Sequence, residues 1–124
     1  MFSGIILFIF FSGHSQTNGD TIYFDQNWNQ ASKDKASYFR VVSIDTQRIC
    51  FMVRDHYLTG QLQMEGAYRS INPDMKMGKF LYWYQNGNRH IECFFKEGKL
   101  EGQYREWYDN GILKTEKSGE NTAL

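Results

Sequence analysis

Imidazole, thiol and carboxylate side chains are the groups in this chain that could support catalysis or metal binding. His56, His90 and Glu92 would offer nitrogen and oxygen ligands of the kind that zinc accepts. Their spacing matches no metal-binding motif, and solvated positions on strands explain them better. His90 precedes Cys93 by three residues, which on a strand places the two side chains on opposite faces and excludes a local Cys–His pair.

The rest of the sequence adds no catalytic motif. It contains neither a phosphate-cradling glycine loop nor a nucleophile elbow. Cys50 and Cys93 would need an oxidising compartment to form a disulfide. In an up-and-down sheet two strands would separate them, beyond the Cα distance of about 7 Å that a disulfide can bridge. We therefore expect two buried free thiols and a protein that is not an enzyme, with no cofactor and no metal.

Composition favours one all-β domain. The 124 residues carry 14 basic and 14 acidic side chains, so no net charge attracts nucleic acid or an anionic membrane. Aromatic residues make up 17% of the chain, and there are 11 glycines and a single proline. Aromatic side chains suit a pleated sheet and glycine suits tight turns, so this mixture predicts short strands joined by hairpins.

A repeated phrase organises the chain. Residues 82–87 read YWYQNG, and residues 106–111 read EWYDNG. Self-similarity at a fixed period indicates a repeat architecture. Three units align on the turn glycines Gly60, Gly87 and Gly111, with an insertion that we place in the loop SINPDMKM. A glutamate follows each turn glycine by five residues, at Glu65, Glu92 and Glu116.

Alternation with period two assigns each side chain to a face of the predicted strands. One face receives the repeat aromatics Tyr82, Tyr84, Tyr104 and Tyr108, together with Phe80, Leu62, Met64, Tyr68, Arg89, Ile91 and Phe95. The opposite face receives Trp83, Trp107, Arg105, Leu81, Gln63, Glu65, His90 and Glu92. The glutamates form either an acidic ladder or, as we favour, an outer face kept soluble by charge. Most aromatics are expected in the core, which leaves Trp83, Trp107 and Arg105 as the candidate binding surface.

Turn residues complete the fold prediction. Asn86-Gly87 and Asn110-Gly111 favour type I′ turns, in which both central residues have positive φ. A longer loop is expected at 96–99, and Gly78 and Gly102 are expected to begin the strands that follow. The predicted fold class is all-β: an antiparallel meander of tandem β-hairpin repeats that forms one elongated sheet.

The region before the repeats is expected to contain strands at 21–24, 36–43 and 48–55, with one helical turn capped by Ser32 between the first two. The phrase YFDQNW at 23–28 loosely echoes WYDNG. We therefore divide the chain into an N-terminal β region at 16–56 that includes a degenerate capping repeat, repeats at 57–118, and a frayed tail at 119–124.

The first fifteen residues resemble a secretory signal peptide. An apolar run from Ile5 to Phe11 is followed by small residues that end at Ser15. The run is too short to span a bilayer, which needs about 20 apolar residues. A buried strand or a start codon placed too far downstream are the alternatives, since no basic residue precedes the run. Export to the periplasm or envelope is the expectation, with no transmembrane span in the mature chain.

The order of aromatic, Asn-Gly, Glu, aromatic, Gly-Lys, Gly and aromatic across residues 57–116 resembles the bacterial variant of the MORN repeat, found in antitoxin-like repeat proteins of the YwqK type. The stretch from DTIYFDQNW to DHYLTGQLQMEG is similar to exported proteins in which such repeats precede a TonB-type domain. Because the sequence stops at Leu124, an energy-transducing role is not carried over.

This resemblance implies a repeat scaffold for binding and no catalytic residues. The leading hypothesis is an exported MORN-like module that binds a protein or a cell-envelope component. The alternatives are a truncated relative of the TonB-type proteins and an antitoxin-like repeat protein. Open edge strands would also allow self-association.

Overall fold

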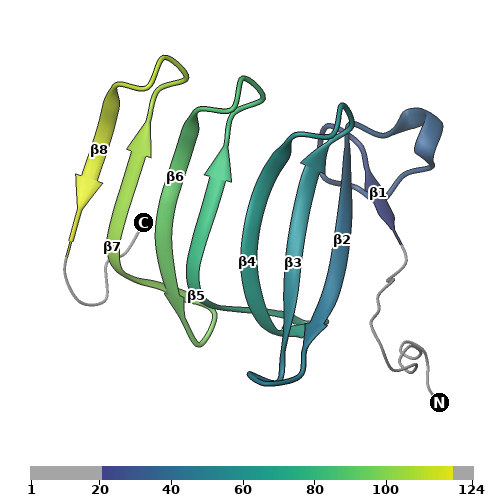
Figure 1. Ribbon diagram of the computed structural model, residues 1–124, viewed down its shortest axis with the longest axis horizontal. Coiled ribbons are helices and arrows are strands. Elements are labelled where there is room, and N and C mark those ends of the chain that lie inside the picture. Colours follow the sequence, from purple (N-terminus) through teal and green to yellow (C-terminus); the bar gives the residue numbers. More distant parts are fainter. Residues whose placement is uncertain (1–20, 119–124) are drawn as a thin grey trace.

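One antiparallel sheet contains every strand that the structure describes (Figure 1). The computed structural model describes residues 21–118, so the predicted signal peptide at 1–15 and the tail at 119–124 lie outside it. The strands are paired in sequence order and run as follows: β1 Ile22–Phe24, β2 Tyr38–Asp45, β3 Cys50–Tyr57, β4 Leu62–Ile71, β5 Asp74–Trp83, β6 Arg89–Lys96, β7 Lys99–Trp107 and β8 Leu113–Lys117. The predicted meander is therefore confirmed.

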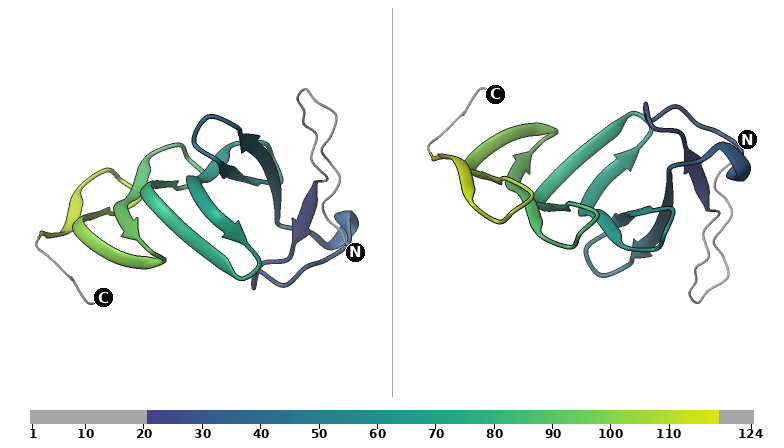
Figure 2. Two further views of the ribbon diagram at one scale, coloured as in Figure 1. Left: turned by 90° about the horizontal axis from the view of Figure 1, so that it is seen from below. Right: turned by 90° about the horizontal axis from the view of Figure 1, so that it is seen from above.

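The sheet forms a single twisted layer, with β1 and β8 at opposite ends (Figure 2). The one helical element among residues 21–118 is the 3-10 turn η2 at Lys33–Lys35, which Ser32 precedes as predicted. Ser32 donates its hydroxyl hydrogen bond to the Asp34 carboxylate and makes no side-chain cap. No helix within this part of the chain is long and apolar enough to cross a membrane.

A cluster of buried side chains on one face, here called the inner face, forms the core. It consists of Val53, Met64, Tyr68, Phe80 and Cys93. Phe80 is fully buried and its ring lies directly against the backbone of Gly66, where a Cβ atom would overlap the ring. Tyr68 and Phe95 each pack edge-on against Phe80, at centroid distances of 5.5 and 5.0 Å. Phe80 therefore joins β4, β5 and β6 into one packed unit.

Bulges place the aromatic residues that follow the second glycine of each repeat. Gly78 and Gly102 do not begin their strands as predicted but lie inside β5 and β7, with φ of 76° and 84°. The pairing register shifts beside each glycine, opposite 65–67 and 93–95. Extra residues at a bulge bend a strand and change the direction of its side chains. The two bulges therefore bring Phe80 and Tyr104 over the inner face at equivalent positions.

The three turns that contain the repeat glycines share one backbone conformation, and all three lie at the same end of the strands (Figure 1). Gly60, Gly87 and Gly111 have φ of 107°, 92° and 90°, and each donates its N–H to the carbonyl of the tyrosine three residues earlier. Asn86 and Asn110 are not among the residues with positive φ, so the type I′ prediction is wrong. Their side-chain oxygens instead accept hydrogen bonds from the backbone N–H two residues later.

The turns at the other end of the strands also differ from the prediction. Glu97 and Gly98 have φ of 51° and 80°, so the type I′ geometry occurs in this two-residue turn rather than in a longer loop. The segment expected as an inserted loop is instead the paired ends of β4 and β5, since Ile71 lies opposite Asp74. Asn72 and Pro73 form the turn, through a cis peptide bond.

Bulges near the start of β4 and β6 place four side chains on the face opposite to the predicted one: Leu62, Gln63, Arg89 and His90. Arg89 lies opposite Trp83 and His90 is the extra residue, so His90 stacks on Tyr84 at 4.1 Å on the inner face. Arg89 contacts Trp107 on the other face, here called the outer face. Leu62 and Gln63 are exchanged in the same way in β4, because the register also shifts there. The prediction failed because strict alternation holds only where the ladder is regular.

Each repeat is fastened to the next through its turn tyrosine. The Tyr57 hydroxyl donates to the Trp83 carbonyl at 2.7 Å, and the Tyr84 hydroxyl donates to the Trp107 carbonyl at 2.8 Å. A similar backbone turn occurs at 25–28, where Trp28 has φ of 64° and donates its N–H to the Asp25 carbonyl. Repeats of this kind are stabilised mainly by contacts with their neighbours.

The contact between Phe80 and Gly66 yields the first prediction. Gly66→Ala should lower the free energy of unfolding by about 3 kcal/mol, because the added methyl group overlaps a fully buried ring. Gly66 is not among the glycines with positive φ, so alanine strains the packing and not the backbone. Urea unfolding measures the effect. Phe80→Leu in the Gly66→Ala background should recover part of the loss; purely additive losses would contradict the clash.

Candidate binding surface

Trp83 and Trp107 lie half-buried on the outer face, each at the end of its strand. Their carbonyls accept the hydrogen bonds from Tyr57 and Tyr84, which hold the backbone of both tryptophans at equivalent places in successive repeats. The Arg89 guanidinium lies 5.8 Å from the centre of the Trp107 ring, within the range of a cation–π contact. The outer face therefore presents two aromatic side chains on a backbone that is fixed in advance.

A charged row crosses the outer face beside the tryptophans. Successive strand pairs align its members, which are Arg54, Glu65, Glu92, Arg105 and Glu116, with the uncharged Leu81 between Glu65 and Glu92. Arg54 donates to Glu65, and Arg105 donates to Glu116, both at 2.7 Å. The three glutamates are thus paired with cations and form no acidic ladder. Arg105, predicted for the binding surface, is committed to this row.

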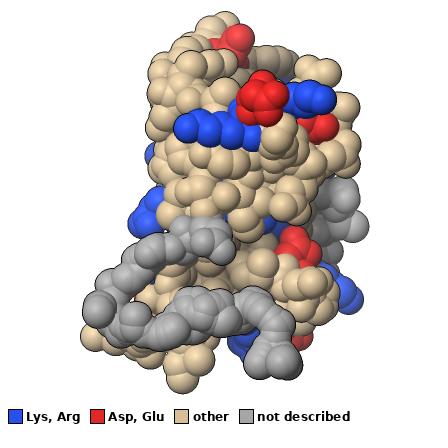
Figure 3. Space-filling model, turned by 90° about the vertical axis from the view of Figure 1, so that its right-hand side faces the viewer, with Lys and Arg blue, Asp and Glu red and all other residues tan. Residues whose placement is uncertain are grey.

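Glu92 is the centre of the charged row. Its carboxylate lies 2.7 Å from the Lys79 nitrogen and 3.8 Å from nitrogens of both Arg89 and Arg105. The hydrogen bond from Lys79, helped by the charges of the two arginines, lowers the pKa of Glu92 below its ordinary value. Figure 3 views the molecule from the β1 end, where acidic and basic side chains likewise lie next to one another. Local pairing leaves the outer face without a strong field of either sign.

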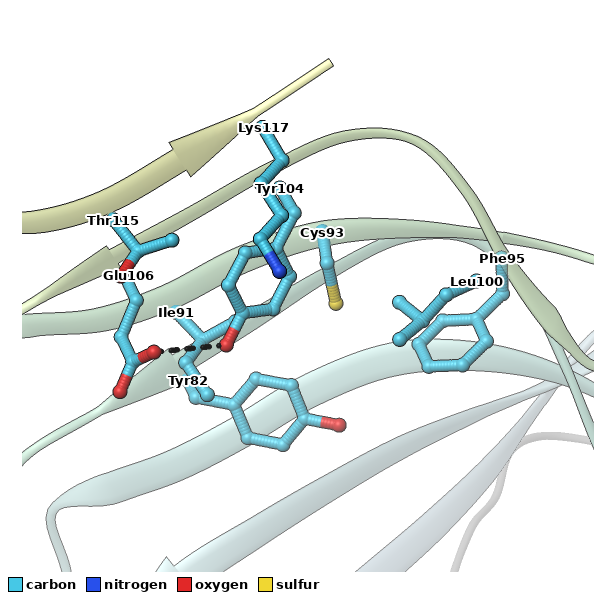
Figure 4. Close-up of a pocket in the computed structure, with 9 residues that line it drawn as sticks. All are labelled: Tyr82, Ile91, Cys93, Phe95, Leu100, Tyr104, Glu106, Thr115 and Lys117. Atoms are coloured by element: carbon cyan, nitrogen blue, oxygen red, sulfur yellow. Dashed lines mark hydrogen bonds between the residues drawn. The ribbon is translucent and has the colours of Figure 1, made fainter. Parts of the chain in front are cut away.

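The inner face is hollowed between β5 and β8, where a pocket of about 460 Å³ lies (Figure 4). Its apolar wall consists of Tyr82, Ile91, Phe95, Leu100 and Tyr104. Its polar lining consists of Cys93, Glu106, Thr115 and Lys117. The Tyr104 hydroxyl donates to Glu106 at 3.1 Å, and the Lys114 ammonium donates to the same carboxylate at 3.1 Å.

A smaller pocket of about 210 Å³ adjoins this one at Tyr82. Its polar centre is a buried ion pair, in which Arg40 donates to both oxygens of Asp55 at 2.6 and 2.7 Å. Asp55 is only 2% exposed, so removal of Arg40 would leave a buried carboxylate without its partner. Sequence inspection missed the pair, because the two residues lie fifteen apart and only the register of β2 with β3 makes them opposite.

The buried tyrosine hydroxyls and the thiol that line the pockets stay protonated at neutral pH. Burial raises the pKa of Tyr68 and Tyr104 to about 12 and that of the Cys93 thiol to about 11. Burial also lowers the pKa of His90, whose imidazole lies 4.0 Å from the Glu106 carboxylate. A thiol with a raised pKa is a weak nucleophile, because the thiolate is the reactive form.

The residues considered for metal binding or a disulfide lie apart. His56 stacks on Phe39 at 4.8 Å, His90 is on the inner face, and Glu92 is on the outer face. Residues 21–118 contain no group of three or more His, Cys, Asp or Glu side chains arranged to hold a metal ion. Cys50 and Cys93 are buried free thiols on β3 and β6, with β4 and β5 between them as predicted.

Comparison with known proteins adds no identification. No protein-family model matches the chain, and no curated protein or solved structure matches it. Any assignment of function therefore depends on the geometry of the two faces.

The position of Glu92 yields the second prediction. Glu92→Gln should destabilise the fold by about 1 kcal/mol at pH 7, because three cations lose one carboxylate that is 15% exposed. Glu116→Gln is the matched control, since Glu116 is 47% exposed and pairs with Arg105. We expect the control to cost less than about 0.5 kcal/mol in urea unfolding.

A comparison of wild type with Glu92→Gln also tests the pH dependence of stability. A carboxyl with a lowered folded pKa stabilises the protein fully above its ordinary value, 4.5 for Glu92, and this contribution is lost as the pH falls through the folded value. The stability gap between wild type and Glu92→Gln should therefore close in acid. An equal gap at pH 3 and pH 7 would contradict the ion pairing.

Proposed function

We propose that this chain is a non-enzymatic MORN-like repeat module that binds a protein or another component of the cell envelope through the outer face of its sheet. The observation that carries the proposal is the placement of Trp83 and Trp107 at equivalent repeat positions on that face. Residues 21–118 form one sheet without a second layer (Figure 2), and both tryptophans are only half-buried. Tryptophan is enriched at binding hot spots, because it buries a large area at low entropic cost.

Preorganisation supports this use of the outer face. The inner face already packs against itself around Phe80, so the fold does not require the outer aromatics for its core. The tyrosine hydrogen bonds fix the spacing of the two tryptophans before any partner arrives. Fixing a surface in advance reduces the entropy that binding must overcome.

The charge distribution limits the class of partner. The glutamates of the charged row are paired with Arg54, Lys79 and Arg105, so apolar contact rather than net charge would drive recognition. A polyanion such as nucleic acid gains little from such a surface. The apolar run from Ile5 to Phe11 supports an exported protein whose partner is periplasmic or envelope-associated.

The edge of the sheet is a weaker candidate for contact. β8 has only five residues, and Lys114, Glu116 and Lys117 are all exposed along it. Short edge strands that carry lysine resist the addition of another strand. Self-association through β8 is therefore disfavoured relative to binding on the outer face.

The third prediction tests the proposed function. Trp83→Ala combined with Trp107→Ala should reduce recovery of partners from an envelope extract at least tenfold, because both aromatic contacts are lost. Trp28→Ala is the matched control: Trp28 is 39% exposed and stacks on Tyr38, away from the outer tryptophans. Circular dichroism checks that all variants fold. Undiminished recovery by the folded double variant would refute the proposal.

A further inference from the structure

The pocket on the inner face between β5 and β8 has the properties of a small-molecule site that the proposed outer-face binding does not use. Its volume of about 460 Å³ lies within the range of roughly 300–1,000 Å³ that is typical of ligand pockets. Such pockets combine an apolar wall with a few placed polar groups. Here the wall is formed by Ile91, Phe95 and Leu100, and the two tyrosine rings complete it.

Lys117 is the polar group that distinguishes this pocket. It follows the turn glycine Gly111 by six residues, the position that Gly66 and Cys93 occupy in the earlier repeats. Those small residues lie beneath or opposite Phe80 and Tyr104, the aromatics of the next strand. β8 is the last strand of the described sheet, so a long side chain fits there. Lys117 lies opposite Tyr104 in the ladder, and Figure 4 shows its side chain directed into the pocket along that of Tyr104.

A second cation lies at the other side of the apolar wall. The Lys76 nitrogen is 5.0 Å from the centre of the Phe95 ring and 5.5 Å from that of Phe80. In the part of the chain that the structure describes, neither Lys76 nor Lys117 forms an ion pair.

The acidic group of the pocket is already neutralised. Glu106 accepts hydrogen bonds from Lys114 and Tyr104, and His90 approaches the same carboxylate at 4.0 Å. The pocket thus pairs an apolar wall with the Lys117 ammonium, while Lys76 lines the adjoining smaller pocket, and charge complementarity favours an anion with an apolar body.

We propose that this pocket binds a small apolar carboxylate. The hydrocarbon body would lie against Ile91, Phe95 and Leu100, and the carboxylate would accept a hydrogen bond from the Lys117 ammonium. Lys76 adds attraction from the far side. Because the pocket and the tryptophans lie on opposite faces, this binding is independent of the proposed outer-face partner.

The fourth prediction uses 2-naphthoate as the probe and its neutral carboxamide as the control ligand. Naphthoate is titrated into the folded chain and followed by NMR. The amide resonances of residues around 91–95 and 104–117 should shift. Lys117→Gln should weaken naphthoate binding roughly tenfold, the loss expected for one charge-assisted hydrogen bond, and leave carboxamide binding unchanged. Lys33→Gln removes the same charge from the distant η2 turn and should have no effect.

Two further variants separate the two proposals. Lys117→Glu should abolish naphthoate binding and favour 2-naphthylmethylamine, because the charge at the pocket is reversed. Trp83→Ala combined with Trp107→Ala should retain naphthoate binding even where envelope partners are lost. Absence of naphthoate shifts at millimolar concentration, equal affinity for the carboxamide, or equal losses in Lys117→Gln and Lys33→Gln would each overturn the assignment.

Discussion

The seating of the Phe80 ring on the bare backbone of Gly66 is the contact on which the rest of the structure depends. A single-layer sheet has no second layer to cover its apolar side chains, so one face must fold over itself. Phe80 achieves this because the bulge at Gly78 directs its ring across β4, where the absence of a Cβ at Gly66 leaves room. Tyr68 and Phe95 close around the same ring. A closely packed interior of this kind tolerates little change in side-chain volume.

This contact divides the sheet into two surfaces with different uses. The inner face supplies the core over β3 to β6 and opens into a pocket over β5 to β8, where β8 is the last strand that the structure describes. The outer face does not supply the core, and it carries paired charges beside Trp83 and Trp107. Turn tyrosines transmit the same spacing from one repeat to the next. A repeat scaffold can thus present equivalent side chains at regular intervals on one side while remaining stable on the other.

The sequence was sufficient to predict an antiparallel meander, the strand order, and the face of Phe80, Tyr82 and Trp83, because these follow from local alternation and turn spacing, whereas several strand ends were placed wrongly. Where the ladder is irregular the prediction failed: His90 changed faces at a bulge, and Asn86 formed a side-chain hydrogen bond where positive φ was expected. The ion pair of Arg40 with Asp55 depends on strand register, which no local pattern encodes. The pocket beside Lys117 is lined by four strands whose registers shift at bulges, and local alternation does not encode those shifts.

Native-state hydrogen exchange is the measurement that tests the central claim most directly, since it reports the free energy of opening at each amide. If the inner cluster around Phe80 holds the sheet together, the slowest amides will lie in β3 to β6, and β1 and β8 will exchange much faster. Equal protection along the whole sheet, or the strongest protection in β7 and β8, would contradict a fold organised by the contact of Phe80 with Gly66.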